Sequence, residues 1–419
     1  MLAALPVSQA SAQESLPNDT EPANEPTHTE RIVEGRPPLY SLTRAAHPLT
    51  WLELAFKPGF RFAESSRIQN LIARKPNTDK ISGISFGVGS AGTSSGFGPR
   101  VTLFHKDLLH RGVSVEIPLL YTYSQYQVYQ FKASAPLASQ TFVDRLNFEL
   151  GAAYSSRARD NFFGIGNDTR ETPEERQLRT VTREASAGFT AKLTDKWTSG
   201  LHVVYRNVGV TKPTVGRSAQ DYFNSASTPG FFGATVASAV FSIGHDNEAV
   251  ENYAFKGGSD QFELSFNRSP GGGQFGYWRY HFDSQHFFWL TDDGRKVIAA
   301  RGMVETNVTS PGHLVPFFDM PVLSSDQILR GFDSFRFRDK SALGLSLEYR
   351  YRIWPALDWG LFIDEGQVAP QLGDMGLNRF HTGYGVRLFV WPKPNLPISI
   401  DYGRSRETWR LYFNINTRF

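Results

Sequence analysis

The chain has 419 residues, a net charge of +3, ten histidines and no cysteine. The lack of cysteine excludes disulfides, thiolate metal sites and a cysteine nucleophile, and the small net charge gives no argument for a nucleic-acid or acidic partner. No run of eighteen apolar residues occurs in the sequence, which excludes a helical membrane span.

Aromatic residues make up 14% of the chain, which also contains 37 glycines, and its mean hydropathy is −0.34. Alternating strands keep mean hydropathy low in a barrel that crosses a membrane, and such barrels are rich in aromatic residues and turns. We therefore predict an all-β, transmembrane barrel. A soluble all-β protein is the alternative.

The N-terminus resembles a secretory signal without its charged front. Ala10-Ser11-Ala12 before Gln13 fits a signal-peptidase site, and Leu2 to Val7 is a short apolar stretch. Residues 1–12 are therefore predicted to be the remnant of a signal peptide, with the true start upstream and export to the periplasm. A tail with chance alanines is the alternative.

Residues 13–81 are predicted to form a periplasmic tail or docking segment. Its first half is polar and broken by six prolines, so it buries too little apolar surface to fold alone. Residues 51–56 could form a strand, and residues 65–74 a short amphipathic helix. The segment offers a possible contact for a periplasmic or outer-membrane protein.

Residues 82–419 read as a succession of strands, which predicts a 16-stranded antiparallel barrel. An even number places both chain ends in the periplasm. The predicted strands are 82–91, 99–106, 110–122, 125–134, 142–156, 178–192, 196–207, 233–244, 258–268, 275–287, 295–308, 341–353, 357–365, 379–390, 397–404 and 409–419.

The connections differ in length. Long polar ones are predicted at 157–177, 208–232, 245–257 and 309–340, and short ones at 193–195, 354–356 and 405–408. Long extracellular loops and tight periplasmic turns are typical of such barrels, so we assign the long connections to the outside. Arg330 then lies on the extracellular loop between the eleventh and twelfth strands.

The two strands after this loop each have one polar face. In 342–353 and 357–365 the apolar residues share one parity, and Glu348 and Asp364 lie on the other. Two carboxylates on one face can hold the guanidinium of Arg330 where water is scarce. The loop is therefore predicted to fold inward, where its position would control the lumen or the barrel seam. The alternative is that these residues form an internal structural contact with no further role.

These residues resemble the BamA-type outer-membrane barrel superfamily. Arg330-Gly331-Phe332 matches a loop tip that folds into the lumen in that family, Phe362, Asp364 and Gly366 match its Phe-x-Asp-x-Gly element, and 160–167 resembles a common loop segment. The resemblance covers about residues 82–419. It implies that the loop tip is held in the lumen by Arg330, Gly331, Phe332, Glu348, Asp364 and Gly366. Residues 13–81 lack the pattern of the periplasmic POTRA modules usual in such proteins, so none is expected.

The last strand alternates clearly and ends on an aromatic residue. Trp409, Phe413 and Phe419 share its apolar parity. A C-terminal aromatic resembles the signal by which outer-membrane barrels are recognised for assembly, so these three residues are assigned that role.

Several sequence motifs match known functional sites but lack the structural context that those sites need. Gly87 to Gly92 matches G-x-G-x-x-G and Gly92 to Gly96 matches G-x-S-x-G, but no helix can follow either. His245, Asp246 and Glu248 could bind a metal on a loop, although solvated polarity is the simpler reading, and His281 and His286 lie on opposite parities. No metal, cofactor or enzymatic activity is expected.

The resemblance implies a protein of the bacterial outer membrane that assists insertion or translocation of outer-membrane or secreted proteins. A Gly- and Ser-rich first strand, 81–92, could leave the seam to the last strand openable. The alternative is a structural anchor or passive pore docked through residues 13–80, and a surface lipase ranks last. Outer-membrane lipid and lipopolysaccharide are the expected surroundings.

Overall fold

The computed structural model describes residues 81–419, except for 92–94, 138–144, 171–175, 214–215, 252, 325–327, 355–356, 394–395 and 416–418. The predictions for residues 1–12 and, apart from Ile81, for residues 13–81 lie outside the described residues. Nowhere in the described ranges is a helix both long and apolar enough to cross a bilayer.

Sixteen long strands form the wall in the described part of the chain, as predicted. They are β1 (Ser82–Ser90), β2 (Phe97–Leu108), β3 (Val113–Tyr121), β4 (Gln127–Leu137), β5 (Arg145–Asn161), β6 (Arg176–Lys192), β7 (Trp197–Thr211), β9 (Gly233–Asp246), β11 (Ala254–Arg268), β12 (Gly276–Trp289), β13 (Lys296–Thr309), β16 (Ser341–Trp354), β17 (Leu357–Ala369), β18 (His381–Lys393), β19 (Leu396–Ser405) and β20 (Trp409–Ile415). Each predicted strand is present, although β5 and β17 run several residues further than predicted.

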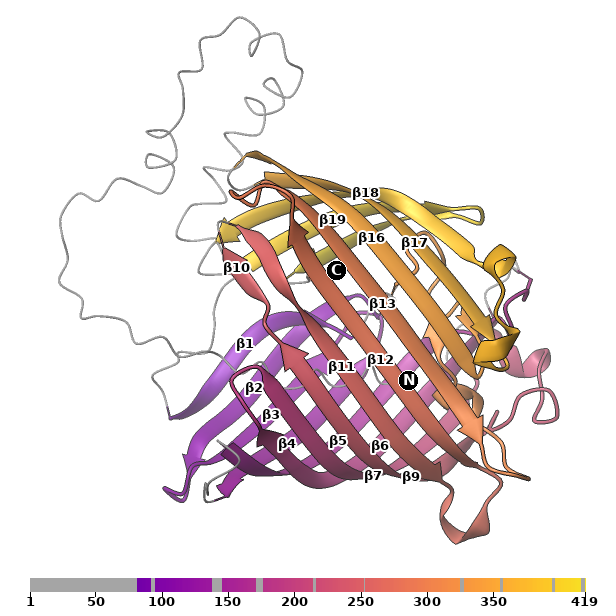
Figure 1. Ribbon diagram of the computed structural model, residues 1–419. Helices are drawn as coiled ribbons and strands as arrows, with labels where there is room; N and C mark the ends of the chain where they lie inside the picture. Colours follow the sequence, from indigo (N-terminus) through magenta and orange to yellow (C-terminus); the bar gives the residue numbers. More distant parts are fainter. Residues whose placement is uncertain are drawn as a thin grey trace, which may run out of the picture.

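Each long strand pairs antiparallel with the next, from β1 with β2 to β19 with β20. The tilted strands curl into a barrel (Figure 1). Such curvature removes most of the unpaired edge that an open sheet would expose.

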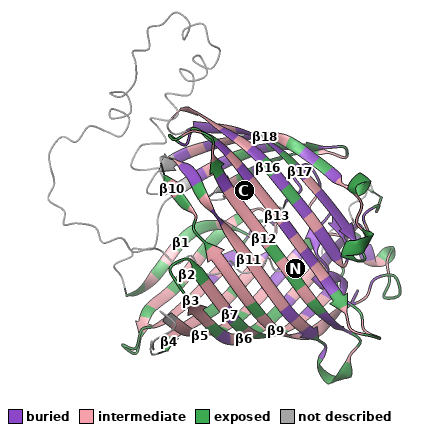
Figure 2. Cartoon of the chain, viewed as in Figure 1, coloured by how far each residue is buried: buried purple, intermediate pink, exposed green. Residues whose placement is uncertain are grey.

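The two faces of the wall differ as strand alternation requires. On β16, Leu345 and Leu347 point outward and are 45% and 50% exposed, whereas Ser346 and Glu348 point into the lumen and are 5% and 0% exposed. Figure 2 shows this alternation of buried and exposed residues along the strands. An apolar outer face and a polar lumen are the pattern of a transmembrane barrel.

The connections define two ends of the barrel. The loop end carries the long connections 162–175, 212–232, 310–340 and 370–380, and the turn end carries short ones such as 193–196. The prediction for 245–257 was wrong, because β9 is the eighth long strand and therefore ends at the turn end, where β10 (Ala249–Glu251) pairs with β11. The short connection 405–408 lies at the loop end. The odd or even position of a strand in chain order, and not the length of the connection after it, determines at which end of the barrel that connection lies.

The connection between β13 and β16 folds into the lumen, as predicted. It contains a short 3-10 helix, η4 (Phe317–Asp319), and two short paired strands, β14 (Val322–Leu323) and β15 (Phe337–Arg338). Its apolar side chains form a core with residues of β13, β16 and β17 inside the barrel, and Leu323, Leu329, Phe332 and Phe337 are each 0% exposed. This connection is called the lumen loop below.

The C-terminal residue departs from the predicted strand. Trp409 and Phe413 face outward and are 55% and 50% exposed, but Phe419 packs inside the lumen, 5.6 Å between ring centroids from Phe287 of β12. Phe419 therefore departs from the alternation predicted for residues 409–419.

Candidate functional site

Arg330 is the centre of a charged cluster in the lumen. Its side chain reaches β17, where Nε and Nη2 each donate to one oxygen of Asp364 at 2.7 Å. The backbone N–H of Arg330 donates to the same carboxylate at 3.0 Å. A bidentate pair with a backbone bond fixes both the side chain and the chain path of the loop tip.

Residues of β16 and β17 complete the shell of this guanidinium. Nη1 donates to Glu348 at 3.3 Å, and Nη2 donates to the hydroxyl of Ser346 at 3.1 Å. The ring of Phe362 lies 3.4 Å from the guanidinium carbon, and aromatic faces attract such cations. The predicted meeting of Arg330 with Glu348 and Asp364 is therefore observed in the structure.

Three further charged residues belong to the cluster. Arg350 donates to Glu348 at 2.7 Å, and Arg387 of β18 donates to Glu348 at 3.1 Å and to Asp401 of β19 at 2.7 Å. Asp401 also lies 3.8 Å from Nη1 of Arg330. The six residues Arg330, Arg350, Arg387, Glu348, Asp364 and Asp401 are called the latch below.

The latch is electrically balanced, with three guanidinium groups and three carboxylates. The three carboxylate side chains are fully buried and the three arginines nearly so. Burial opposes the charge on Arg330, but Asp364 and Glu348 outweigh it and raise its pKa above the ordinary value. Buried charges persist only when paired in this way.

The loop tip also joins the last two strands. Gly331 has φ +90°, its N–H donates to the hydroxyl of Tyr412 at 2.9 Å, and its carbonyl accepts from Ser405 at 2.7 Å. A Cβ at Gly331 would lie 2.5 Å from the carbonyl carbon of Arg404. Both the backbone conformation and the close approach therefore require glycine here.

We expect Gly331→Ala to destabilise the barrel more than Gly312→Ala. Both glycines lie on the lumen loop with positive φ, but a Cβ at Gly312 meets nothing within 4 Å. The left-handed backbone costs either variant about 1–2 kcal/mol, and the contact with Arg404 adds about 1–3 kcal/mol at Gly331 only. The difference is measured as the temperature at which the folded barrel, separated from the unfolded chain by its mobility on a gel, unfolds. Equal unfolding temperatures for the two variants would refute the steric role of Gly331.

Phe332 and Gly366 act through packing. Phe332 is fully buried and lies edge-to-face with Phe337 at 5.3 Å between centroids. A Cβ at Gly366 would come within 2.9 Å of Leu323 and 3.3 Å of Leu329. The glycine of the predicted Phe-x-Asp-x-Gly element therefore makes room for the lumen loop.

Two more contacts hold the lumen loop, one on each side of the latch. Asp319 in η4 binds Arg206 of β7 and the hydroxyl of Tyr277 on β12. Arg336 binds Glu407 at 2.7 Å and Thr169 at 2.7 Å. No sequence pattern predicts these pairs, which join segments up to 167 residues apart.

The segment 160–167 also contacts the lumen loop and the connection after β17. Phe162 packs against Phe317 at 5.2 Å between centroids, and the side chain of Asn167 accepts from the N–H of Val368 at 3.0 Å and donates to the carbonyl of Arg379 at 2.9 Å. The loop end is thus covered by interlocked loops.

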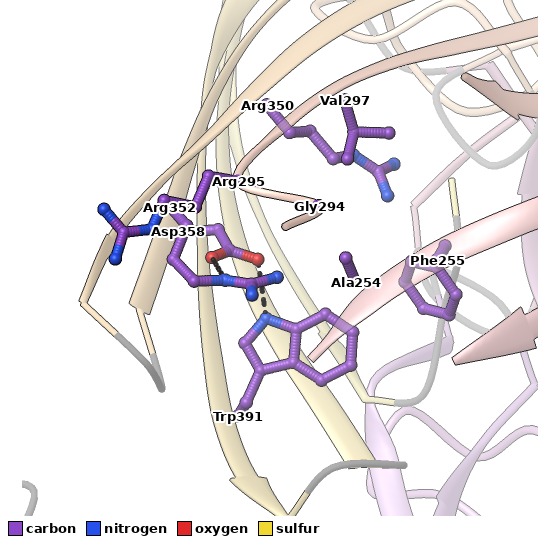
Figure 3. Close-up of a pocket in the computed structure, with 9 residues that line it drawn as sticks. All are labelled: Ala254, Phe255, Gly294, Arg295, Val297, Arg350, Arg352, Asp358 and Trp391. Carbon is purple, nitrogen blue, oxygen red and sulfur yellow. Dashed lines mark hydrogen bonds and ion pairs between the residues drawn. The ribbon is translucent and has the colours of Figure 1, made fainter. Parts of the chain in front are cut away.

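A small pocket lies below the latch toward the turn end (Figure 3). Asp358 there accepts from Arg352 at 3.1 Å and from the indole of Trp391 at 2.9 Å. Arg350, which also lines it, stacks over Phe389 at 4.6 Å and lies 5.5 Å from the ring of Phe419. The C-terminal residue thus contacts the latch through Arg350.

Comparisons with known proteins agree with this geometry. The model of the Omp85 superfamily domain matches residues 107–419. BamA from Haemophilus ducreyi lacking POTRA domains 1-3 is 15% identical with a TM-score of 0.61, over 80% of this chain and 70% of that one. CdiB from Acinetobacter baumannii is 11% identical with a TM-score of 0.47, over 80% and 65% of the two chains.

No curated protein matches the sequence. The likeness to BamA, at this low identity, shows a shared barrel fold. The family model, by contrast, covers about three quarters of the chain and includes every residue of the latch. The chain therefore belongs to the Omp85 superfamily.

Proposed function

We propose that this protein lies in the bacterial outer membrane and assists the insertion or translocation of outer-membrane or secreted proteins. The loop end faces the outside of the cell and the turn end faces the periplasm. Outer-membrane lipid and lipopolysaccharide surround the wall. The protein provides a path for client proteins and not an enzymatic activity, and it uses no cofactor.

The observation that carries this proposal is the condition of β1. All nine residues of β1 pair with β2. Its outward side chains Ile84, Phe86 and Val88 are 58%, 67% and 77% exposed. A strand edge that is released when β1 and β20 part can accept another strand by backbone hydrogen bonding.

Small residues make β1 easy to part from a neighbour. Its inward positions are Gly83, Ser85, Gly87 and Gly89, and a Cβ at Gly87 would meet nothing within 4 Å. Few side-chain contacts therefore support this edge. Because the lumen loop fills the loop end, an exit through the wall next to β1 is favoured over a passive pore.

Reconstitution tests the proposal. Full-length protein in liposomes should increase the fraction of a urea-unfolded outer-membrane barrel that becomes folded and protease-resistant, compared with empty liposomes. No increase, together with periplasmic proteins that bind the full chain but not a chain lacking residues 13–80, would favour the structural anchor instead.

A further inference from the structure

Four polar side chains lie together on the outer wall, away from the latch. Asp260 of β11 accepts from the hydroxyl of Ser284 at 2.6 Å and contacts His286 at 3.1 Å, both on β12. His245 of β9 lies 3.4 Å from the other oxygen of Asp260. These four residues are called the outer-wall cluster.

Strand register places the cluster on the outside. Asp260 is directly opposite His245 and Ser284, and on β12 the same parity carries Phe282 and Phe288, which are 43% and 54% exposed. The other parity of β12 faces the lumen, where Phe287 is 4% exposed. The outer-wall cluster is therefore bracketed by apolar side chains within the face that contacts the membrane.

Ionisable side chains on a lipid-facing surface are costly unless something pairs with them. The side chains of Asp260 and His286 remain 33% and 38% exposed, so their mutual hydrogen bonds do not cover them. Position on this face thus indicates a polar ligand from the membrane. Glu248, grouped with His245 in the sequence, instead accepts from the hydroxyl of Ser259 at 2.8 Å.

The depth of the cluster matches lipid headgroups. His245 is one residue from the turn end of β9, and His286 is three residues from the end of β12, which is about 10 Å along a strand. Trp197, which is 43% exposed, packs on His245 at 4.9 Å between centroids. Tryptophan at this level is typical of the membrane interface.

The backbone is shaped for one of the imidazoles. A Cβ at Gly258 would lie 2.1 Å from Nδ1 of His286, so the ring rests on the bare glycine opposite it. On the other side, β13 places Gly302 beside Ser284 and Ala300 beside His286. No bulky side chain of β13 therefore separates the cluster from the lipid.

We propose that the outer-wall cluster binds the headgroup of a phospholipid that carries a primary ammonium, such as phosphatidylethanolamine, in the periplasmic leaflet. The carboxylate of Asp260 accepts from the ammonium. The imidazoles of His245 and His286, each bonded to Asp260 through one ring nitrogen, donate to the phosphate through the other nitrogen as imidazolium groups. Both signs of charge in the headgroup then find a partner. A headgroup with phosphate alone satisfies the imidazoles but offers no cation to Asp260.

Native mass spectrometry of the full-length protein tests this, with phosphatidylethanolamine, phosphatidylglycerol and phosphatidylcholine of identical acyl chains. The ethanolamine lipid should be retained at least about tenfold more tightly than the choline lipid, since a charge-assisted bond is lost in the latter. Asp260→Asn should remove this preference, and Gly258→Ala should weaken binding by displacing His286. His110→Ala, which removes an imidazole that is 93% exposed on a turn, is the matched control.

Equal retention of the three lipids by the unaltered protein, or an unchanged preference in Asp260→Asn, would overturn the proposal. So would a co-purified membrane protein that Asp260→Asn releases, because the cluster would then be a protein contact. For every variant, the fraction that migrates on a gel as folded barrel before heating is also measured. This separates loss of lipid binding from loss of folding.

Discussion

An Arg330→Ala variant is expected to conduct ions steadily through a lumen that the unaltered protein keeps shut. The change removes the side-chain bonds to Asp364, Glu348 and Ser346, keeps only the backbone bond to Asp364, and leaves a net negative charge in the latch. Breaking one partner of a buried charge cluster costs about 3–5 kcal/mol. The loop tip is then released, and planar-bilayer recording measures the conductance while thermal unfolding measures the lost stability.

Two further variants keep this prediction sharp. Arg379→Ala removes an exposed ion pair with Asp168 at the same end, and surface pairs contribute about 0–1 kcal/mol, so it should remain closed and stable. Arg330→Lys keeps the charge but cannot bind Asp364 through two parallel bonds, so its effect should be intermediate. A silent, fully stable Arg330→Ala barrel would mean that Asp319 and Arg336 hold the loop without the latch.

The latch was partly predictable because strand alternation is a local rule. Parity alone places Glu348 and Asp364 on one face, and it applies whatever the neighbours of the strands are. The pairing of Arg387 with Asp401 needs more, since they meet only because β18 and β19 pair in a register that sets them directly opposite each other. Sequence patterns give parity but not register.

The remaining differences have the same physical origin. Asn167 reaches Val368 across 201 residues of sequence, and no local pattern determines which loops meet at one end of a barrel. Phe419 packs in the lumen, where it contacts aromatic side chains and the guanidinium of Arg350. Such long-range packing overrides the alternation that holds within a strand.

Joining β20 to β2 across the end of β1 is expected to abolish the insertion of client proteins. Phe97 at the start of β2 and Phe413 of β20 are 6.2 Å apart between ring centroids, and Phe97 is paired with Ser90, the last residue of β1. The chain has no native cysteine, so cysteines at these two positions can be linked alone by a short bifunctional thiol reagent. Activity in liposomes should fall to the level of empty liposomes.

The reason is that a client strand needs the edge of β1, and a link over this edge prevents β1 and β20 from parting. Cysteines at Leu345 and Glu365 provide the matched control, because these residues are directly opposite on β16 and β17, which lie within the continuous ladder and have no need to separate. A cleavable reagent should restore activity at the first pair. Full insertion by the linked Phe97 and Phe413 pair would exclude the seam as the exit, and the client would then have to pass the latch.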